Sequence, residues 1–251
     1  MKVTIITIVY NNKKYINDCI ESVSSQNYTN IEHIVVDGGS TDGTQQIIEQ
    51  HKKNLGYYVS EKDNGLYNAL NKGIKHATGD IVGILHSDDV FFSNESISNI
   101  VDAFNNSKAE IVYSNGIFVD RNDISKVKRI YKVKPFKNWH LKLGWIPLHT
   151  GIFIKKEVFN SVGFYDENYR IASDYDFSIK LFKSNFKFCF LDRYVVKMRL
   201  GGKSTTASLQ KLKSKEDLDI IRRHKLLGYF TLFCKIARKV PQYIKPLLVK
   251  I

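Results

Sequence analysis

The first 115 residues alternate short apolar runs with segments of helical periodicity. The apolar runs are rich in β-branched residues and nearly continuous, which is typical of strands buried on both faces. They cover residues 3–9, 31–36, 57–60, 81–85 and 110–113. The segments between them have the length of crossover helices and cover residues 14–25, 44–51, 66–77 and 96–105. This pattern predicts an α/β open sheet, mostly parallel, with helices on both faces.

Polar segments follow the first four predicted strands at the point where each one ends. In chain order they read "YNN" from Tyr10, "DGGSTDGT" from Asp37, "EKDNG" from Glu61 and "HSDD" from His86. In open α/β sheets, ligands bind outside the carboxyl ends of the strands. We therefore expect these four segments to meet along one rim of the sheet and to form a ligand site there.

The alternation stops at about residue 116. The stretch up to residue 148 contains both tryptophans and many lysines, which indicates a hairpin and irregular loops over the sheet. The segment "HTGIFIKKEVF" from His149 predicts a strand that enters a helix, and "ASDYDFSIKLFKSN" from Ala172 predicts a helix after a polar turn. We expect one domain of two halves, residues 1–115 and 116–205, followed by an extension, residues 206–251.

The positive charge of the chain is concentrated in this extension. The chain of 251 residues has a formal net charge of +13, yet residues 197–251 hold 14 of the 38 Lys and Arg and 3 of the 25 Asp and Glu. Such asymmetry indicates attachment to an anionic partner, either lipid or RNA. We favour lipid and expect no nucleic acid, because no RNA-binding motif accompanies the charge.

The extension also has the periodicity of an amphipathic helix between residues 225 and 240. Its apolar positions share one side: Leu226, Tyr229, Phe230, Phe233, Ile236, Ala237 and Val240. Lys235, Arg238 and Lys239 fall on the other side. Such a helix can lie in the interface of an anionic membrane, or it can pack on the rest of the domain. We expect the membrane.

The rest of the composition is typical of a protein of the cytoplasm. With 43% hydrophobic residues the chain can build a sizeable core. Its three cysteines are far apart and form no Cys-x-x-Cys pair, which argues against a zinc site or a disulfide framework. Thr4 and Thr7 interrupt the N-terminal apolar run, so we interpret it as a strand and not as a signal peptide. We expect a cytoplasmic protein, peripheral on the inner face of the cell membrane.

Asp88 and Asp89 end a buried strand and would repel each other there. Their charges can be balanced by Lys or Arg from elsewhere, by solvent, or by a divalent cation. Mg²⁺ and Mn²⁺ usually bind one or two carboxylates together with substrate phosphates. Since three further polar strand ends converge on the same rim, we favour a metal that also binds a diphosphate, over a solvated acidic turn.

Two further carboxylates and one lysine are candidates for ligand contact. Asp37 stands at a strand terminus beside a glycine-rich turn and can accept from a base or a ribose hydroxyl. Asp174 lies at the start of a predicted helix and can take a proton from an incoming hydroxyl, whereas Asp176 is more typical of a local first-turn acid. "LGGKST" is not a Walker loop, because Lys197 stands where a glycine is required, but Lys203 can reach a diphosphate.

The ordered set of motifs resembles family 2 of the glycosyltransferases, with the GT-A fold, as found in bacterial polysaccharide assembly. The resemblance covers roughly the first 205 residues through "ITIVYNN", "IEHIVVDGGSTDGT", "SEKDNGLYNALNKGIKHATGDIVGILHSDD", "HTGIFIKKEVF" and "VGFYDENYRIASDYDF". It implies inverting transfer of a sugar from a nucleoside-diphosphate sugar, by default a UDP-sugar, to a lipid-linked saccharide acceptor. The first half would bind the nucleotide-sugar and the second half the acceptor.

The resemblance also implies roles for single residues. Those that would contact the nucleotide are Thr7, Val9, Asn11, Asp37, Asp63, Asn71 and Lys72. Asp88 would hold the ribose or the metal, Asp89 would coordinate Mn²⁺ or Mg²⁺, and Asp174 would be the general base.

Two positions depart from the family pattern. His86 stands where many relatives carry an acid, and Ser173 precedes Asp174 where many carry a glutamate, which leaves Asp176 as an alternative base.

Two other functions compete with sugar transfer. A sugar nucleotidyltransferase would need a glycine-rich loop near the N-terminus, where residues 10–14 have no glycine. A non-catalytic nucleotide-sugar-binding module recruited to membranes would not need Asp89 and Asp174.

Overall fold

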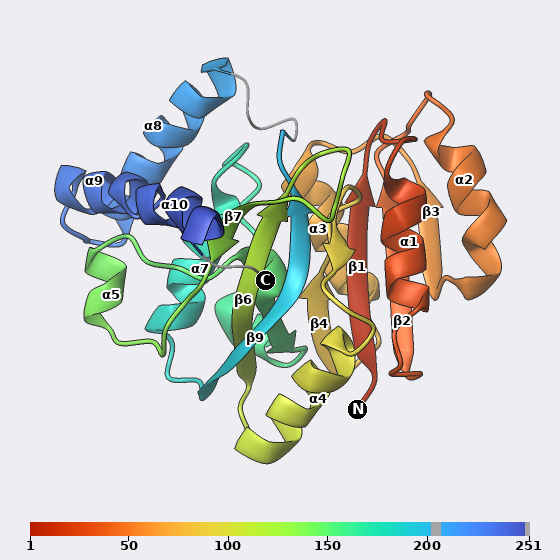
Figure 1. Cartoon of the computed structure of the whole chain (residues 1–251), viewed down its shortest axis with the longest axis horizontal. Helices are drawn as coiled ribbons and strands as arrows, with labels where there is room; N and C mark the ends of the chain where they lie inside the picture. The colour runs from red at the N-terminus through yellow and green to blue at the C-terminus, as the bar shows by residue number, and fades with distance from the viewer. Residues whose placement is uncertain (202–206, 249–251) are drawn as a thin grey trace.

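The computed structural model describes residues 1–201 and 207–248. Within them one nine-stranded sheet has the order β3-β2-β1-β4-β8-β6-β9-β5, and β7 pairs with β6 (Figure 1). The strands are β1 (Val3–Val9), β2 (Ile31–Asp37), β3 (Tyr57–Ser60), β4 (Ile81–Ile84), β5 (Val90–Phe91), β6 (Ile111–Val119), β7 (Val127–Tyr131), β8 (Ile152–Lys155) and β9 (Phe188–Arg199). The helices are α1 (Ile16–Ser24), α2 (Thr44–His51), α3 (Leu66–His76), α4 (Ser96–Ser107), α5 (Trp139–Lys142), α6 (Val158–Val162), α7 (Ser173–Lys183), α8 (Ala207–Arg223), α9 (Tyr229–Ala237) and α10 (Val240–Leu248).

The N-terminal half of the sheet is parallel, as its apolar pattern predicts. β1 pairs with β2 and β4, and β2 pairs with β3, all in parallel. In this register Val9 lies opposite Asp37, and Asp37 lies opposite Ser60. The ends of three strands are therefore level, and the polar segments that follow them begin at the same rim.

The C-terminal half of the sheet mixes both directions. β8 runs antiparallel between β4 and β6, and β7 forms the expected hairpin with β6. The twelve-residue β9 was not predicted from the sequence; it pairs with β6 in parallel and with β5 antiparallel. Its register with β6 shifts near Asn115, and Asp192 and Arg193 interrupt its apolar pattern, which hides it from a search for periodicity.

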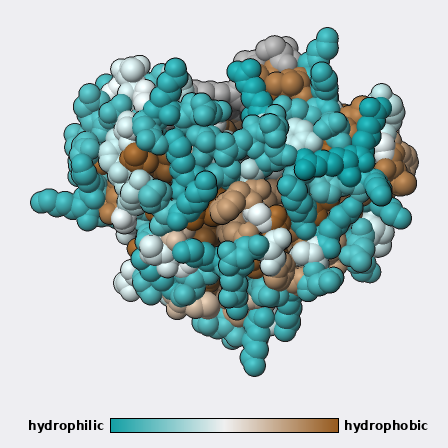
Figure 2. All heavy atoms as spheres, turned by 180° about the vertical axis from the view of Figure 1, so that it is seen from behind, coloured by the Kyte–Doolittle hydropathy of each residue, from teal (hydrophilic) through white to brown (hydrophobic). Residues whose placement is uncertain are grey.

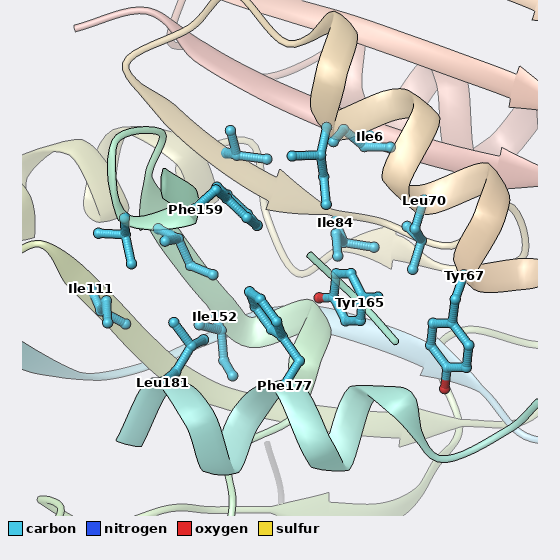
Figure 3. Packing of buried hydrophobic residues seen from close by; sticks show 14 of the residues in the cluster. Ile6, Tyr67, Leu70, Ile84, Ile111, Ile152, Phe159, Tyr165, Phe177 and Leu181 are labelled. Atoms are coloured by element: carbon cyan, nitrogen blue, oxygen red, sulfur yellow. The ribbon is translucent and has the colours of Figure 1, made fainter. Parts of the chain in front are cut away.

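Helices cover both faces of the sheet. On one face Cys19 and Val23 of α1 and Ile100 of α4 share a cluster with Val3 and Ile5. On the other face α3 and α7 pack against a second cluster that includes Ile6, Ile84 and Ile152. Figure 3 shows the α7 residues Phe177 and Leu181 pointing into this second cluster, with Tyr67 of α3 at its edge. The packing fixes the direction of α7, at whose N-terminus Asp174 lies.

The three C-terminal helices pack on the domain and lie together on one side of it (Figure 1). The Thr231 hydroxyl of α9, fully buried, donates to the carbonyl of Lys142, the last residue of α5, at 2.7 Å. In α10, Gln242 accepts through its side-chain oxygen from Arg129 of β7, with 2.7 Å to Nε. Two helices replace the single predicted one, since Pro241 suits the first turn of a new helix better than the interior of an old one.

The outer faces of α9 and α10 are apolar, while Lys235 of α9 and the following Arg238 and Lys239 line a cavity on the inner side. We call the exposed residues the outer apolar surface: Leu227, Tyr229, Phe230, Phe233, Ile236, Val240, Tyr243 and Ile244, all between 48% and 69% exposed. The Lys235 side chain on the opposite side of α9 is only 13% exposed. Figure 2 shows a mostly hydrophilic face, with apolar atoms at its right edge, the side on which these helices lie. None of the described helices has the length and hydrophobicity to cross a membrane.

Close approach of α9 requires a glycine at position 144, which supplies a test of this docking. Gly144 has φ of +63°, and a Cβ there would lie 2.6 Å from Lys235 Cβ and 2.8 Å from the Thr231 carbonyl oxygen. We expect Gly144→Ala to lower the free energy of unfolding by about 1–3 kcal/mol more than Gly163→Ala, measured by urea denaturation. Gly163 is the matched control, with φ of +81° and nothing within 4 Å of its added Cβ. Equal losses in the two variants would contradict tight docking of α9.

Candidate active site

The polar segments after β1, β2 and β4 are hydrogen-bonded to one another at the rim. The Asn11 amide donates to Ser40 Oγ at 2.7 Å, and Asn11 Oδ1 accepts from the Thr41 amide at 2.8 Å. The Asn12 side chain donates to Ser87 Oγ at 2.8 Å. Asn11 has φ of +49°, a conformation that asparagine tolerates better than most residues. The predicted convergence of these strand ends is therefore present in the structure.

Asp37 is fully buried at this rim and is surrounded by hydroxyl groups. Its carboxylate accepts from the Ser40 amide at 3.0 Å, from the Ser40 hydroxyl, and from the Ser60 hydroxyl at 2.5 Å. These bonds join the ends of β2 and β3. In this conformation Asp37 stabilises the loop. Its predicted contact with the nucleotide base requires one of these hydroxyl hydrogen bonds to break.

Asp63 lies directly over the glycine-rich turn. A Cβ on Gly38 would clash with Asp63 Oδ2, so a larger residue there would push the Asp63 side chain out of this position. Its Oδ1 accepts from the Gly65 amide at 2.8 Å, which leaves a partly exposed carboxylate facing the turn. Asp63 is thus better placed than Asp37 to meet a ligand without rearrangement.

The other predicted nucleotide contacts already have partners within the chain. Asn71 is buried and bonds through both side-chain atoms to the backbone of Tyr165, and through its nitrogen to Glu167. Lys72 forms an ion pair of 2.6 Å with Glu61 and keeps 28% of its side chain exposed. Asn71 therefore holds the loop before α7, whereas Lys72 can exchange its partner for a phosphate.

Thr7 and Val9 have side chains inside the core. The Thr7 hydroxyl lies 2.9 Å from His33 Nε2, and Val9 packs among Ile16, Ile20 and Ile48. Because both side chains are buried, only the backbone atoms of Thr7 and Val9 can line the predicted nucleotide pocket, and their role there stays a prediction. Lys203 lies outside the described residues, so its predicted role stays a prediction.

Arginines balance the acidic pair at the end of β4. Arg121 Nη1 lies 3.3 Å from Asp88 Oδ2, and Arg199 donates from Nη1 to the Asp88 carbonyl at 2.6 Å. The Arg199 amide donates to Asp89 Oδ1 at 2.9 Å. Both guanidinium carbons also lie near the ring of Tyr15, at 4.7 and 4.8 Å from its centroid. The sequence did not reveal these arginines, because β9 and the β6–β7 loop bring them from more than 30 residues away.

The two carboxylates differ in their access to a ligand. The Asp88 side chain is 21% exposed, whereas Asp89 is 2% exposed. Burial, followed by the charge of Asp88, raises the pKa of Asp89 well above its usual range, because an ionised carboxylate is costly in an apolar surrounding.

The metal ligands that the protein offers here fit a cation that takes most of its other ligands from the substrate and from water. No group of three or more acidic, histidine or cysteine side chains that could hold a metal occurs among residues 1–201 and 207–248. One or two carboxylates at a phosphate site are nevertheless the usual protein share of a Mg²⁺ site. Asp88 is the accessible ligand here, and Asp89 is adjacent to it.

Asp174 lies at the N-terminus of α7, in contact with three elements. The Asp174 amide donates to the Tyr67 hydroxyl at 3.3 Å, and this hydroxyl donates to the Ile171 carbonyl at 2.7 Å. Asp174 Oδ2 lies 3.5 Å from His149 Nδ1, and the side chain keeps 23% of its surface exposed. It therefore combines a fixed position with access to a ligand.

His149 connects Asp174 to the end of β4. His149 Nε2 lies 2.5 Å from His86 Nε2, so one of the two nitrogens carries the hydrogen and the other accepts it. Burial and the neighbouring His149 lower the pKa of His86 to about 3, and burial also lowers the pKa of His149. His86, which precedes the acidic pair, thus contacts the neighbour of the predicted base.

Asp174 is held in its ionised form. Burial alone raises the pKa of Asp174, but the charges of Lys213, His149 and Lys235 outweigh it and lower the pKa below its ordinary value. A carboxylate that is ionised and partly exposed can accept a proton from a hydroxyl group.

Asp176 points elsewhere and serves the packing of the helices. It is fully buried, with Oδ1 at 2.7 Å from His224 Nε2 and Oδ2 at 2.6 Å from Lys180 Nζ. His224 follows α8, so Asp176 joins α7 to the C-terminal extension. Between the two candidate bases, only Asp174 is accessible to a substrate.

Glu216 of α8 fixes the loop that leads to Asp174. Its carboxylate accepts from three consecutive amides, those of Arg170, Ile171 and Ala172, each at 2.9 Å. Glu216 itself is buried. No sequence signal separates it from the other charged residues of α8, so its role emerges only from the tertiary structure.

A profile of Glycosyl transferase family 2 matches residues 4–163 of this chain. The chain belongs to this family. It is 33% identical over 228 residues to an uncharacterized glycosyltransferase of Rickettsia prowazekii, covering 86% of this chain and 70% of the relative. It is 28% identical over 178 residues to a PGL/p-HBAD biosynthesis glycosyltransferase of Mycobacterium bovis, covering 66% of this chain and 64% of the relative.

Solved structures share the fold of this glycosyltransferase. Residues 1–349 of S. aureus TarS, in complex with UDP-GlcNAc, superpose with a TM-score of 0.70 at 20% identity, covering 98% of this chain and 80% of that fragment. The mannosyltransferase PcManGT of Pyrobaculum calidifontis, in complex with GDP-Man and Mn²⁺, gives a TM-score of 0.68 at 18% identity, covering 98% of this chain and 74% of that chain. The expected GT-A fold is confirmed.

The charges around Asp174 predict the acid limb of the glycosyltransferase pH profile. Removing the positive charge of Lys213 by Lys213→Met raises the pKa of Asp174, so this predicted base becomes protonated at a higher pH. We expect the acid limb of the UDP-sugar hydrolysis rate to move to higher pH in this variant. Lys211→Met changes an exposed lysine of the same helix and leaves the limb in place. Coincident profiles of the wild type and Lys213→Met would contradict the coupling.

Proposed function

We propose that this chain is an inverting glycosyltransferase that uses a nucleoside-diphosphate sugar, by default a UDP-sugar, and a lipid-linked saccharide acceptor in surface polysaccharide assembly. The observation that carries the proposal is Asp174, an accessible carboxylate held ionised at the N-terminus of α7 and connected through the two histidines to the end of β4. Residues 1–115 would hold the donor, and residues 116–205 with the C-terminal helices would hold the acceptor.

A single displacement follows from this arrangement. The acceptor hydroxyl gives its proton to the Asp174 carboxylate while its oxygen forms a bond to the anomeric carbon of the sugar. The bond from that carbon to the diphosphate oxygen breaks on the opposite face, and its electron pair leaves with the diphosphate. Asp174 is the one carboxylate among the residues that line the cavity beside α7. The choice of a single direct displacement follows the resemblance to the family.

The charge of the leaving diphosphate needs compensation. Asp88, with Asp89 beside it, would hold a Mn²⁺ or Mg²⁺ ion, which supplies electrostatic stabilisation of the leaving group. Arg121 and Arg199 would keep the loop that carries both carboxylates in place, and Lys72 would turn from Glu61 to a phosphate.

The outer apolar surface supports attachment to a membrane. A helix that merely packs on its domain turns its apolar side inward, but here Phe230 and Phe233 point outward while Lys235 points inward. Aromatic and aliphatic side chains on an exposed helix face can enter the headgroup region, and the net positive charge of the extension favours anionic lipid. We therefore propose a peripheral position on the inner face of the cell membrane, which brings a lipid-linked acceptor within reach.

The identity of the base is tested by a matched pair of variants. Asp174→Asn is expected to lower kcat by about 10²–10⁴-fold and to leave the affinity for UDP within a factor of about two, because only proton transfer is lost. Asp176→Asn is expected to retain transfer but to lose about 1–3 kcal/mol of stability, since it weakens the buried contacts with His224 and Lys180. Product formation, UDP calorimetry and thermal unfolding measure these outcomes. An active Asp174→Asn enzyme would refute the assignment.

Membrane attachment is tested by flotation of the full chain with vesicles containing anionic phospholipid. Phe230→Ser with Phe233→Ser is expected to lower the bound fraction about tenfold or more, because two side chains lose apolar burial of about 1.5–3 kcal/mol each at full insertion. Phe164→Ser is the control, since Phe164 is 41% exposed and lies outside the C-terminal helices. Unchanged flotation of the double variant would contradict the proposed membrane attachment.

A further inference from the structure

A cavity of about 130 Å³ lies between β7, the start of α7 and the C-terminal helices. Asp174 and His149 form part of its wall. Five of its lining side chains are cationic, and we call it the basic cavity: Arg129, Lys213, Lys235, Arg238 and Lys239. A cavity of about 10–15 Å³ already holds one water molecule, so this one has room for several waters or for one small anionic group.

The cations of the basic cavity exceed its carboxylates. Lys213 and Lys235 share Asp217, at 3.6 and 2.7 Å, and both lower the pKa of Asp174 through their charge. Arg129 bonds to the neutral amide of Gln242. Arg238 and Lys239 have no carboxylate partner within residues 1–201 and 207–248. Against five positive groups stand Asp174 and Asp217, which leaves an excess of three positive charges.

The side chains that carry this excess of positive charge are partly shielded from bulk water. Burial lowers the pKa of Arg238 and of Lys239, and burial takes the pKa of Lys235 to about 8 although Asp217 opposes the change. Desolvated like charges are costly unless an anion compensates them. The clustering is therefore explained by a ligand that supplies negative charge.

The basic cavity lies on the acceptor side of Asp174. Its walls come from β7, the loop before β8, α7, α8, α9 and α10, and they include no residue of the segments after β1, β2, β3 and β4. The donor diphosphate is expected at those four segments. A ligand of the basic cavity is thus a different molecule, positioned directly beside the carboxylate that would receive the acceptor proton.

We propose that the basic cavity binds a phosphate or diphosphate group of the acceptor, close to the hydroxyl that Asp174 deprotonates. This inference rests on the proposed function and specifies the class of acceptor. An excess of three positive charges suits a phosphate or diphosphate better than a single carboxylate, and guanidinium groups match phosphate oxygens in a bidentate manner. The outer apolar surface lies on the same helices, α9 and α10, so a lipid attached to that phosphate would leave the cavity toward the membrane.

Binding is tested without any transfer reaction. Inorganic pyrophosphate is titrated calorimetrically into the full chain in the presence of EDTA, which suppresses metal-dependent binding at the donor site. Arg238→Gln with Lys239→Gln is expected to weaken this binding about tenfold or more, since two charged hydrogen-bond donors are lost. Lys211→Gln with Lys215→Gln removes the same charge from exposed positions of α8 and is expected to bind like the wild type. Equal affinity of all three proteins would overturn the proposal.

Two further measurements keep the result interpretable. UDP affinity with Mn²⁺ is expected to be unchanged in the cavity variant, and a parallel loss of UDP binding would overturn a site separate from the donor. If the double variant fails to fold, Lys239→Gln alone serves, with an expected loss of a few-fold in pyrophosphate affinity. Pyrophosphate binding that persists in a protein inactive with every nucleotide-sugar would contradict the proposed function and leave the phosphate site standing.

The source of the phosphate is distinguished by two acceptors. A short prenyl diphosphate-linked monosaccharide in detergent and a water-soluble glycerol phosphate oligomer are compared as substrates of the wild type and the cavity variant. A KM raised about tenfold for the prenyl acceptor alone supports a lipid-borne phosphate, and a rise for the oligomer alone supports a soluble one. Unchanged KM for every acceptor that the enzyme uses would overturn the role of the cavity.

Discussion

The carboxylate of Glu216 joins the C-terminal extension to the reaction centre. It accepts hydrogen bonds from three successive backbone amides, and the next residues begin the helix that carries Asp174. Buried amides without partners are costly, so α8 has to be docked for this loop to keep its shape. Asp176 with His224 and Asp166 with Arg223 reinforce the same contact. The extension is therefore part of the catalytic domain, and its charges belong to the site.

Because the loop before Asp174 depends on α8, the positive charge of the extension has to be interpreted differently. A net charge on a tail usually indicates long-range attraction to an anionic surface. Here Lys213 and Lys235 act at short range, because they lower the pKa of Asp174 and line the same cavity. The same helices turn apolar side chains to the outside. One structural element thus serves electrostatics on its inner side and apolar contact on its outer side.

The acidic pair after β4 follows the same rule of charge compensation. Two adjacent carboxylates at the end of a buried strand need positive charge, and Arg121 and Arg199 provide part of it from distant segments. Arg199 comes from β9, a strand with interrupted periodicity that pairs in two directions. The arginines leave Asp88 partly exposed, so one carboxylate of the pair is accessible to a ligand.

The sequence alone determined the parallel half of the sheet, since continuous apolar runs and helical spacers admit few other arrangements, and it placed the polar strand ends at one rim. It named Asp174 as the candidate base but left Asp176 as an alternative, and the difference in their exposure came only from the structure. Only the tertiary structure decided that Thr7 and Val9 face the core, that His86 contacts His149, and that Glu216 and Arg199 support the site. The physical reason is the separation of these residues along the chain. Periodicity depends on the local environment of a segment, whereas these contacts join residues 44 to 111 positions apart. Such contacts form only once the chain is folded.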